Sequence, residues 1–194
     1  MNITTVSTTE LVFIIAFVVV LVAGIAAFFV QHRKRRTARL RTQFGGAEYA
    51  RAVEKGGNRR LAEAGLEKRA ERVEKFHVQP LTAGDRVRFL DSWRGVQSRF
   101  VDGPAGAVTE ADLLLGDVMS ARGYPVCDFE QRAADISVDH PVVLENYRTA
   151  HDIALKQTRG QASTEELRQA MVHYRTLFEE LVNEPEMATT KVAS

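Results

Sequence analysis

The residues whose side chains are best able to take part in a reaction lie between positions 122 and 151 of the sequence. This stretch holds the single cysteine of the chain, Cys127, together with several carboxylates, tyrosines and histidines. Such groups serve as general acids and bases, nucleophiles or metal ligands. The candidates for a functional cluster are Arg122, Tyr124, Asp135, Asp139, His140, Tyr147 and His151.

No sequence pattern assigns a reaction to these residues. A di-iron bundle carries Glu-x-x-His on each of two helices, whereas the chain contains this motif only once, at Glu74–His77. One cysteine cannot form a paired zinc motif, and the glycines of GGAEYARAVEKGGN do not form a phosphate-binding loop. We expect no catalytic residue, metal or cofactor, and whether the chain is an enzyme stays open. Tyrosines and arginines also suit a protein interface, or simply the core and surface of a bundle.

A long apolar segment, LVFIIAFVVVLVAGIAAFFV, occupies residues 11–30 and contains no charge. As a helix with a rise of about 1.5 Å per residue it spans about 30 Å, the thickness of the hydrocarbon core of a bilayer. A cleaved signal peptide would have positive charge before the apolar run, whereas here only Glu10 precedes it. The segment therefore predicts a single transmembrane helix, with the lipid bilayer as a partner.

A basic run follows the apolar segment and indicates its orientation. Its members are Arg33, Lys34, Arg35, Arg36, Arg39 and Arg41. Positive residues flank the cytoplasmic end of a membrane helix. We therefore expect an inner (cell) membrane protein with its N-terminus outside and its C-terminal domain in the cytoplasm. The same cations could meet anionic headgroups, although the topology signal already explains them.

The charge balance is uneven along the chain. The whole chain has a net charge of +1, but residues 31–75 carry 14 Lys and Arg against 6 Asp and Glu, and residues 76–194 carry 12 against 18. The overall balance argues against a nucleic-acid partner. The split into a basic and an acidic half suggests contact with a charged surface or a protein. The single cysteine fits a reducing compartment.

The remainder of the sequence predicts helices and no strand. Apolar residues recur at helical spacing in segments bounded by caps, glycines and prolines; these segments are about 59–76, 84–101, 105–121, 129–136, 141–158 and 164–182. The fold class is all-α, with one N-terminal transmembrane helix and a soluble bundle of about five to six helices. The predicted organisation is a tail (1–10), the membrane helix (11–30), a basic linker or hinge (31–58), the bundle (59–182) and a disordered tail (183–194).

Four stretches carry a resemblance to known proteins: FGGAEYARAVEKGG, WRGVQSRFVDGPAGAV, RGYPVCDFEQRAADISVDHP and ELRQAMVHYRTLFEELV. They span most of residues 44–182 and exclude the apolar segment. They resemble a group of uncharacterised bacterial helical proteins described as hypothetical secreted or membrane proteins. The resemblance implies a bacterial source; it transfers neither an activity nor functional residues.

Three functional hypotheses follow. The first is a non-enzymatic, membrane-anchored scaffold or protein-interaction module. The second is a small-ligand sensor or an enzyme with its site in the 122–151 region. The third is self-association through the charged helix at 59–76, whose narrow apolar stripe also suits a short coiled coil.

Overall fold

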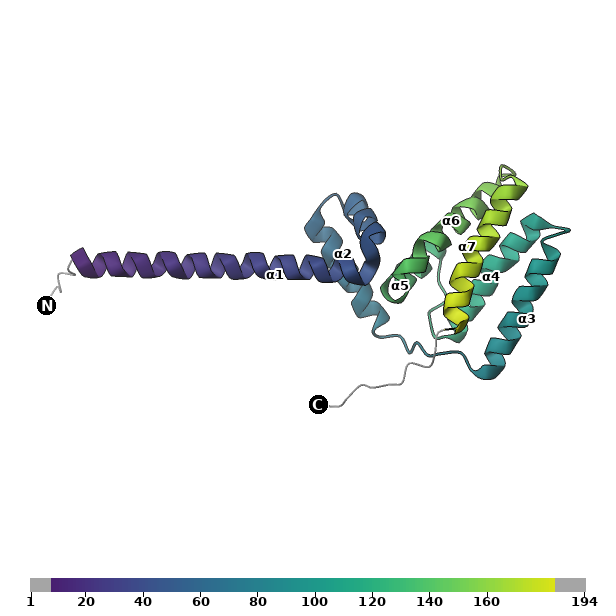
Figure 1. Cartoon of the computed structure of the whole chain (residues 1–194), viewed down its shortest axis with the longest axis horizontal. Helices are drawn as coiled ribbons and strands as arrows, with labels where there is room; N and C mark the ends of the chain where they lie inside the picture. Colours follow the sequence, from purple (N-terminus) through teal and green to yellow (C-terminus); the bar gives the residue numbers. More distant parts are fainter. Residues whose placement is uncertain (1–7, 184–194) are drawn as a thin grey trace.

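The computed structural model describes the backbone from Thr8 to Asn183 and the side chains from Phe17 onward. Within this part the chain forms seven helices and no strand, which confirms the all-α prediction (Figure 1). The predicted N-terminal and C-terminal tails lie outside the described residues, apart from their inner ends.

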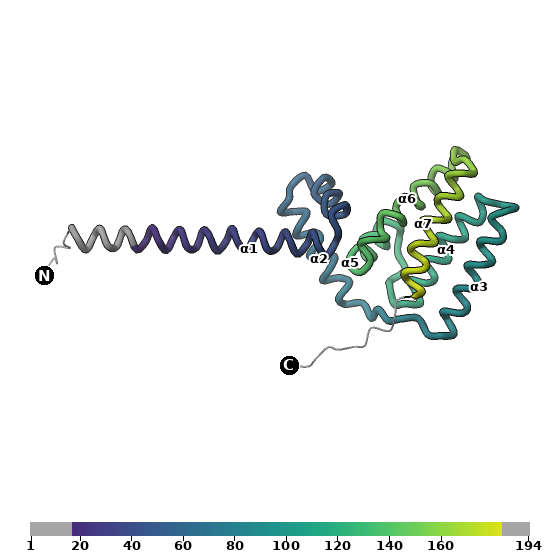
Figure 2. The backbone as a smooth tube through the Cα atoms, in the orientation of Figure 1, coloured from purple at the N-terminus to yellow at the C-terminus, as the bar shows by residue number. Residues whose placement is uncertain are grey.

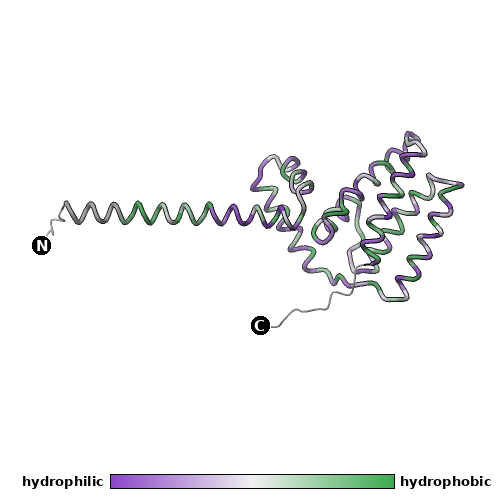
Figure 3. The backbone as a smooth tube through the Cα atoms, in the orientation of Figure 1, coloured by the Kyte–Doolittle hydropathy of each residue, from purple (hydrophilic) through white to green (hydrophobic). Residues whose placement is uncertain are grey.

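The first helix, α1 (Thr8–Gly56), is much longer than the others and projects away from the bundle (Figures 1 and 2). It is apolar at first and becomes strongly hydrophilic where it approaches the other helices (Figure 3). In length and composition it is the one helix of the described chain able to cross a membrane, and 0% of its apolar window is buried. Large apolar side chains such as Phe17 and Phe28 are exposed on it, and the exposure of apolar surface to water is unfavourable.

The segment predicted as a linker and hinge is folded from Leu40 onward. A kink at Gly45, with φ of 71°, divides α1 into two limbs, and the second limb (46–56) turns back as a hairpin with α2 (Arg59–Val73). Phe44 is 0% exposed and packs in a small cluster with Leu40, Tyr49 and Leu66. Residues 40–56 of the predicted linker are therefore helical and bury apolar side chains against α2.

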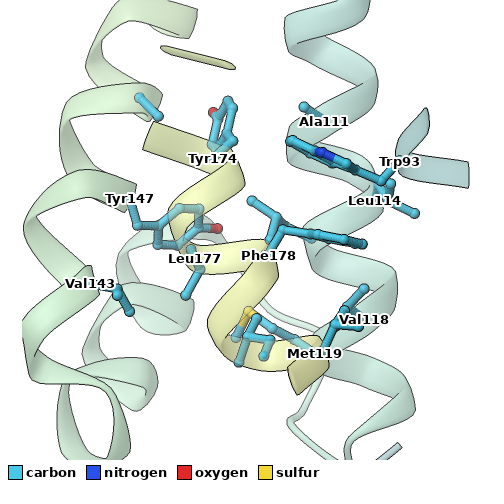
Figure 4. Packing of buried hydrophobic residues seen from close by; sticks show 14 of the residues in the cluster. Trp93, Ala111, Leu114, Val118, Met119, Val143, Tyr147, Tyr174, Leu177 and Phe178 are labelled. Atoms are coloured by element: carbon cyan, nitrogen blue, oxygen red, sulfur yellow. The ribbon is translucent and has the colours of Figure 1, made fainter. Parts of the chain in front are cut away.

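The bundle contains α3 (Ala83–Arg99), α4 (Pro104–Ala121), α5 (Phe129–Asp139), α6 (Pro141–Thr158) and α7 (Thr164–Asn183). Helix α7 packs between α4 and α6, with α3 outside α4 and α5 beside α6 (Figure 1). The core lies along α7, where Trp93 stacks on Phe178 with ring centroids 4.7 Å apart (Figure 4). Because α7 is apolar on most of its inner surface, it can bury side chains against both neighbours.

Helix ends follow the capping residues of the sequence. Thr82 and Asp128 accept hydrogen bonds from Asp85 N and Gln131 N at the starts of α3 and α5, as expected for N-caps. Ser163 and Glu166 form the predicted capping box at the start of α7. The helix predicted to end near residue 76 stops at Val73, and the one predicted to end at 136 continues to Asp139.

Some apolar residues of the predicted helices are exposed and lie outside the core. Val87 is 60% and Val101 82% exposed, whereas Phe89 and Val96 of the same segment are buried with Trp93. Helix α3 is an outer helix that contacts α4 and α7 on one side only. Its buried stripe is therefore narrow, and the apolar residues beside it face solvent.

Candidate functional site

The structure separates the seven predicted site residues into three groups. Four of them, Arg122, Tyr124, Asp139 and His140, fasten the end of the bundle where α4 and α7 finish. The Arg122 Nη1 donates to the Leu181 carbonyl at 3.1 Å, and the Tyr124 hydroxyl donates to the Asp139 carboxylate at 2.8 Å. His140 is buried, with Nδ1 3.3 Å from a Glu180 oxygen. Asp139 is the last residue of α5, and His140 occupies the N-cap position of α6.

Asp135 belongs to a second group, at the contact between α5 and α2. Its carboxylate is 1% exposed and lies 3.3 Å from the Arg72 guanidinium, and it accepts a hydrogen bond of 2.7 Å from Gln131. Burial raises the pKa of Asp135, and the contacts with Gln131 and Arg72 oppose that shift. The residue therefore holds the α1–α2 hairpin to the bundle.

Tyr147 and His151 form the third group, one turn apart on α6. They meet residues from three other helices: Asp112 of α4, Arg132 of α5 and Tyr174 of α7. We name these five residues the inner polar cluster. Both tyrosines are 0% exposed, and Figure 4 shows them within the apolar packing around α7. Of the seven predicted residues, the structure brings only Tyr147 and His151 into this cluster.

The cluster is built around an Arg–Asp pair. Arg132 Nη2 lies 3.4 Å from an Asp112 oxygen, and both side chains are largely buried. Gly116, one turn after Asp112, leaves room for the Arg132 guanidinium, because a Cβ at this position would lie only 2.9 Å from Arg132 Nη1. The His151 ring stacks on Phe129 with centroids 3.4 Å apart and an interplanar angle of 5°. These contacts fix the orientations of the guanidinium and the imidazole.

Burial keeps the titratable neighbours of the Arg–Asp pair in their neutral forms. It raises the pKa of both tyrosine hydroxyls, and the nearby Asp112 charge adds to this effect. Burial also lowers the pKa of His151 and raises that of the adjacent Cys127 thiol. Near neutral pH the cluster thus presents hydroxyls, an uncharged imidazole and a thiol. Such groups form hydrogen bonds but are poor nucleophiles.

Five polar atoms in this cluster have no hydrogen-bond partner among the described residues: Asp112 Oδ1, Arg132 Nε, Tyr147 Oη, His151 Nδ1 and Tyr174 Oη. The Tyr174 hydroxyl faces Asp112 but lies outside strict hydrogen-bond geometry. Buried polar groups are nearly always hydrogen-bonded, and each exception costs about 1–3 kcal/mol. Among the described residues, this cluster therefore holds more buried polar atoms without a partner than any other part of the bundle.

Three members of the cluster were absent from the predicted site. Asp112 gave a usable signal, because it lies on the same face of α4 as the buried residues Val108, Leu115 and Met119. A carboxylate on an apolar stripe requires a buried partner. Arg132 and Tyr174 gave no comparable signal, since only the packing of α5 and α7 shows that they meet Asp112.

A separate ionic network joins the α1–α2 hairpin to the bundle. Its centre is Glu48, whose side chain is 5% exposed and lies 2.7 Å from Arg69 of α2 and 3.4 Å from Arg148 of α6. Arg148 is itself 7% exposed at its side chain. A buried charge is tolerated only when it is paired. This network therefore fixes how the first helix sits on the bundle.

The predicted basic run lies on the part of α1 between the apolar segment and the kink, residues 31–44, which we name the stalk. A groove of about 640 Å³ runs between the stalk and α2. We name it the stalk groove; its lining residues are His32, Arg35, Arg36, Arg39, Leu40, Gln43, Glu67, Ala70, Glu71 and Glu74. Three of the six predicted basic residues line it, whereas Arg41 lies over the Tyr49 ring and Arg33 and Lys34 are exposed. The basic run in the sequence therefore corresponds to one wall of this groove. The acidic wall comes from α2, and only the folded chain shows that it lies opposite.

Among the residues whose side chains the structure describes, no three His, Cys, Asp or Glu residues gather as a potential metal site. Comparison of the chain with protein-family models, with curated proteins and with solved structures found no match.

Proposed function

We propose that the chain is a single-pass protein of the inner (cell) membrane of a bacterium, whose helical bundle serves in the cytoplasm as a non-enzymatic scaffold or protein-interaction module. The observation that carries the proposal is the continuity of α1. Its exposed apolar part passes without interruption into a helix that packs against α2. A membrane anchor built this way presents the bundle in a defined orientation.

The orientation of the proposed anchor rests on charge. The basic residues directly after the apolar stretch favour the cytoplasmic side for the bundle. The resemblance to uncharacterised bacterial proteins supports the bacterial source. The free Cys127 also suits a reducing compartment.

The state of the polar groups supports an interaction role over catalysis. The two buried tyrosines, the His151 imidazole and the partly buried Cys127 thiol are held neutral by burial. Most predicted site residues instead make contacts between helices. On the outer side of the bundle, exposed apolar side chains such as Val87 of α3 and Leu113 of α4 remain available for a partner.

Reporter fusions test the membrane topology. A reporter active only in the cytoplasm and one active only outside it are each fused after Ser194 of the full chain. We expect activity from the cytoplasmic reporter alone, in the membrane fraction. Activity from the external reporter would reverse the proposed orientation. Recovery of the chain in the soluble fraction would refute the anchor itself.

Site-specific photo-crosslinking in the native cell tests the interaction role. A photoreactive residue replaces Val87 or Leu113 in the full-length chain, and Thr158 of α6, at the far end of the bundle, serves as the matched exposed control. A discrete cross-linked product at Val87 or Leu113, absent at Thr158, supports a docking face on α3 and α4. Identical patterns at all three positions, or no product at any, would refute it.

The inner polar cluster favours a second candidate function, a sensor of a small polar ligand. Five polar atoms without described partners motivate it. A ligand that binds there raises the thermal unfolding midpoint by mass action. The shift must disappear in the Tyr174→Phe variant and persist in a His77→Gln variant, since His77 is exposed and outside the cluster. A screen of small polar metabolites without any shift counts against this candidate.

A further inference from the structure

The stalk groove has walls of opposite charge. Its α1 wall consists of residues at helical spacing on one face: His32, Arg35, Arg36, Arg39, Leu40 and Gln43. Its α2 wall consists of Glu67, Ala70, Glu71 and Glu74, again on one face. Because the two helices present these faces to each other, cations and carboxylates share one groove.

Only part of this charge is neutralised across the groove. Arg36 and Glu67 form a two-pronged ion pair across the groove. Arg35 and Arg39 on one wall, and Glu71 and Glu74 on the other, are exposed and form no ion pair with any described residue. No ion pair joins these four charges across the groove, so a molecule that carries both signs can bridge them.

The apolar surface of α1 begins next to His32, at the edge of the groove. Phe28, one turn before His32, lies with its ring centroid 6.2 Å from that of the imidazole. Ile25, Phe28 and Phe29 are 48%, 65% and 57% exposed. A molecule with a charged head in the groove would therefore find an apolar path for a hydrocarbon chain along the same helix.

We propose that the stalk groove binds the headgroup of an amine-bearing phospholipid, with the phosphate on Arg35 and Arg39 and the ammonium on Glu71 and Glu74. Guanidinium groups recognise phosphate oxygens with charge-assisted hydrogen bonds, and a primary ammonium donates three hydrogen bonds to carboxylates. The proposal rests on the membrane anchoring proposed above, which places His32 two residues beyond the apolar stretch, at headgroup depth.

The carboxylates favour this headgroup over an anionic one. A phospholipid with a glycerol headgroup carries the phosphate charge but no cation. It would leave Glu71 and Glu74 unmatched beside an added negative charge. Attraction to the basic run alone would instead favour the anionic lipid, so the preference between the two lipids separates the site from simple charge attraction.

The binding experiment uses the full chain purified in a mild non-ionic detergent. Dihexanoyl phosphatidylethanolamine and dihexanoyl phosphatidylglycerol are titrated separately, and native mass spectrometry gives each dissociation constant. We expect the ethanolamine lipid to bind about three- to tenfold more tightly, the range for one or two exposed ion pairs. Equal binding, or a preference for the glycerol lipid, would overturn the proposal.

Two double variants and a matched control assign the contacts. Glu71→Gln with Glu74→Gln should remove the preference by weakening ethanolamine-lipid binding to the level of the glycerol lipid. Arg35→Gln with Arg39→Gln should weaken the binding of both lipids. Arg33→Gln with Lys34→Gln removes two cations from the same run without touching the groove and should change neither constant. A control as damaging as the Arg35/Arg39 variant would overturn the site.

A water-soluble competitor identifies the source of the headgroup. Glycerophosphoethanolamine carries the same phosphate and ammonium but no acyl chains. If it displaces the lipid at similar concentrations, the groove recognises a free phosphoethanolamine compound and the lipid assignment is wrong. Because this binding assay runs in detergent, its failure leaves the topology result intact, and an exported reporter would leave the measured binding intact.

Discussion

At the scale of single residues, His151 couples stability to pH. Burial lowers the pKa of its imidazole below the ordinary value of 6.5. The unfolded chain therefore binds more protons than the folded chain as the pH falls below about 6.5, so stability decreases with acidification in that range. We expect the thermal unfolding midpoint of the full chain to fall between pH 7.5 and 5.5, and to fall less in the His151→Gln variant.

The charged groups that face His151 act in both directions. Asp112, Asp152 and Glu130 raise its pKa and Arg132 lowers it, but burial is the largest effect. The raised pKa of Asp135 has the opposite effect on stability as the pH falls. Asp135 is present in both the wild type and the His151→Gln variant, so its contribution cancels when the two are compared. A His77→Gln variant provides the control for the loss of an exposed histidine. Parallel pH curves for the wild type and the His151 variant would contradict the prediction.

Gly123 is the residue whose backbone most requires glycine. It has φ of +96°, and a Cβ there would lie 2.4 Å from the backbone oxygen of His77. Left-handed backbone costs about 1–2 kcal/mol for other residues, and the clash with a backbone atom adds to it. We expect Gly123→Ala to destabilise the chain by about 2–4 kcal/mol in chemical denaturation.

Gly106 supplies the comparison for this substitution. It lies in the first turn of α4, and a Cβ there meets nothing within 4 Å. Since alanine favours a helix over glycine by up to about 1 kcal/mol, Gly106→Ala should be neutral or stabilising. Similar losses in both variants would show that the His77 contact is not the cause.

At the scale of helices, Glu48 holds the α1–α2 hairpin against the bundle. Its carboxylate is the buried partner of Arg69 and Arg148. Glu48→Gln removes the charge and leaves the buried Arg148 with weaker partners, and we expect a loss of about 2–4 kcal/mol in the free energy of unfolding. Glu145→Gln breaks an ion pair with Arg51 in which the Glu145 side chain is 58% exposed. It should lower the free energy of unfolding by less than about 1 kcal/mol. Equal losses of stability in the two variants would show that the Glu48 network contributes no more than an exposed ion pair.

The hairpin also bears on self-association. Leu66 and Val73 of α2 are buried within the chain itself, so the apolar stripe that suggested a coiled coil is already occupied by α1 and α5. Leu61 is the member of that stripe left 67% exposed. Association of two chains through α2 would have to use its charged face.

At the scale of the whole molecule, the packed stalk predicts a fixed orientation between the apolar helix and the bundle. The stalk of residues 31–44 extends about 21 Å at 1.5 Å per residue. We expect a single narrow distance distribution between spin labels at Arg33→Cys and Ser98→Cys, measured by pulsed electron paramagnetic resonance in a Cys127→Ser background.

Loss of the stalk packing provides the contrast for this measurement. Leu40→Ala with Phe44→Ala empties the small cluster that holds α1 to α2, and the distance distribution should broaden. A broad distribution already in the unaltered stalk would show that residues 31–58 behave as the hinge that the glycines suggested.

The sequence by itself determined the features that depend on local spacing and composition. The apolar stretch, the all-α class, the caps at Thr82, Asp128 and Ser163 and the break at Gly45 all follow from neighbours within a few residues. Tertiary structure decided where the polar groups meet. Arg132 reaches Asp112 only because α5 and α4 both pack against α6. The acidic wall of the stalk groove exists only because α2 folds back along α1. Contacts between distant residues depend on the packing of whole helices, which short-range periodicity does not encode.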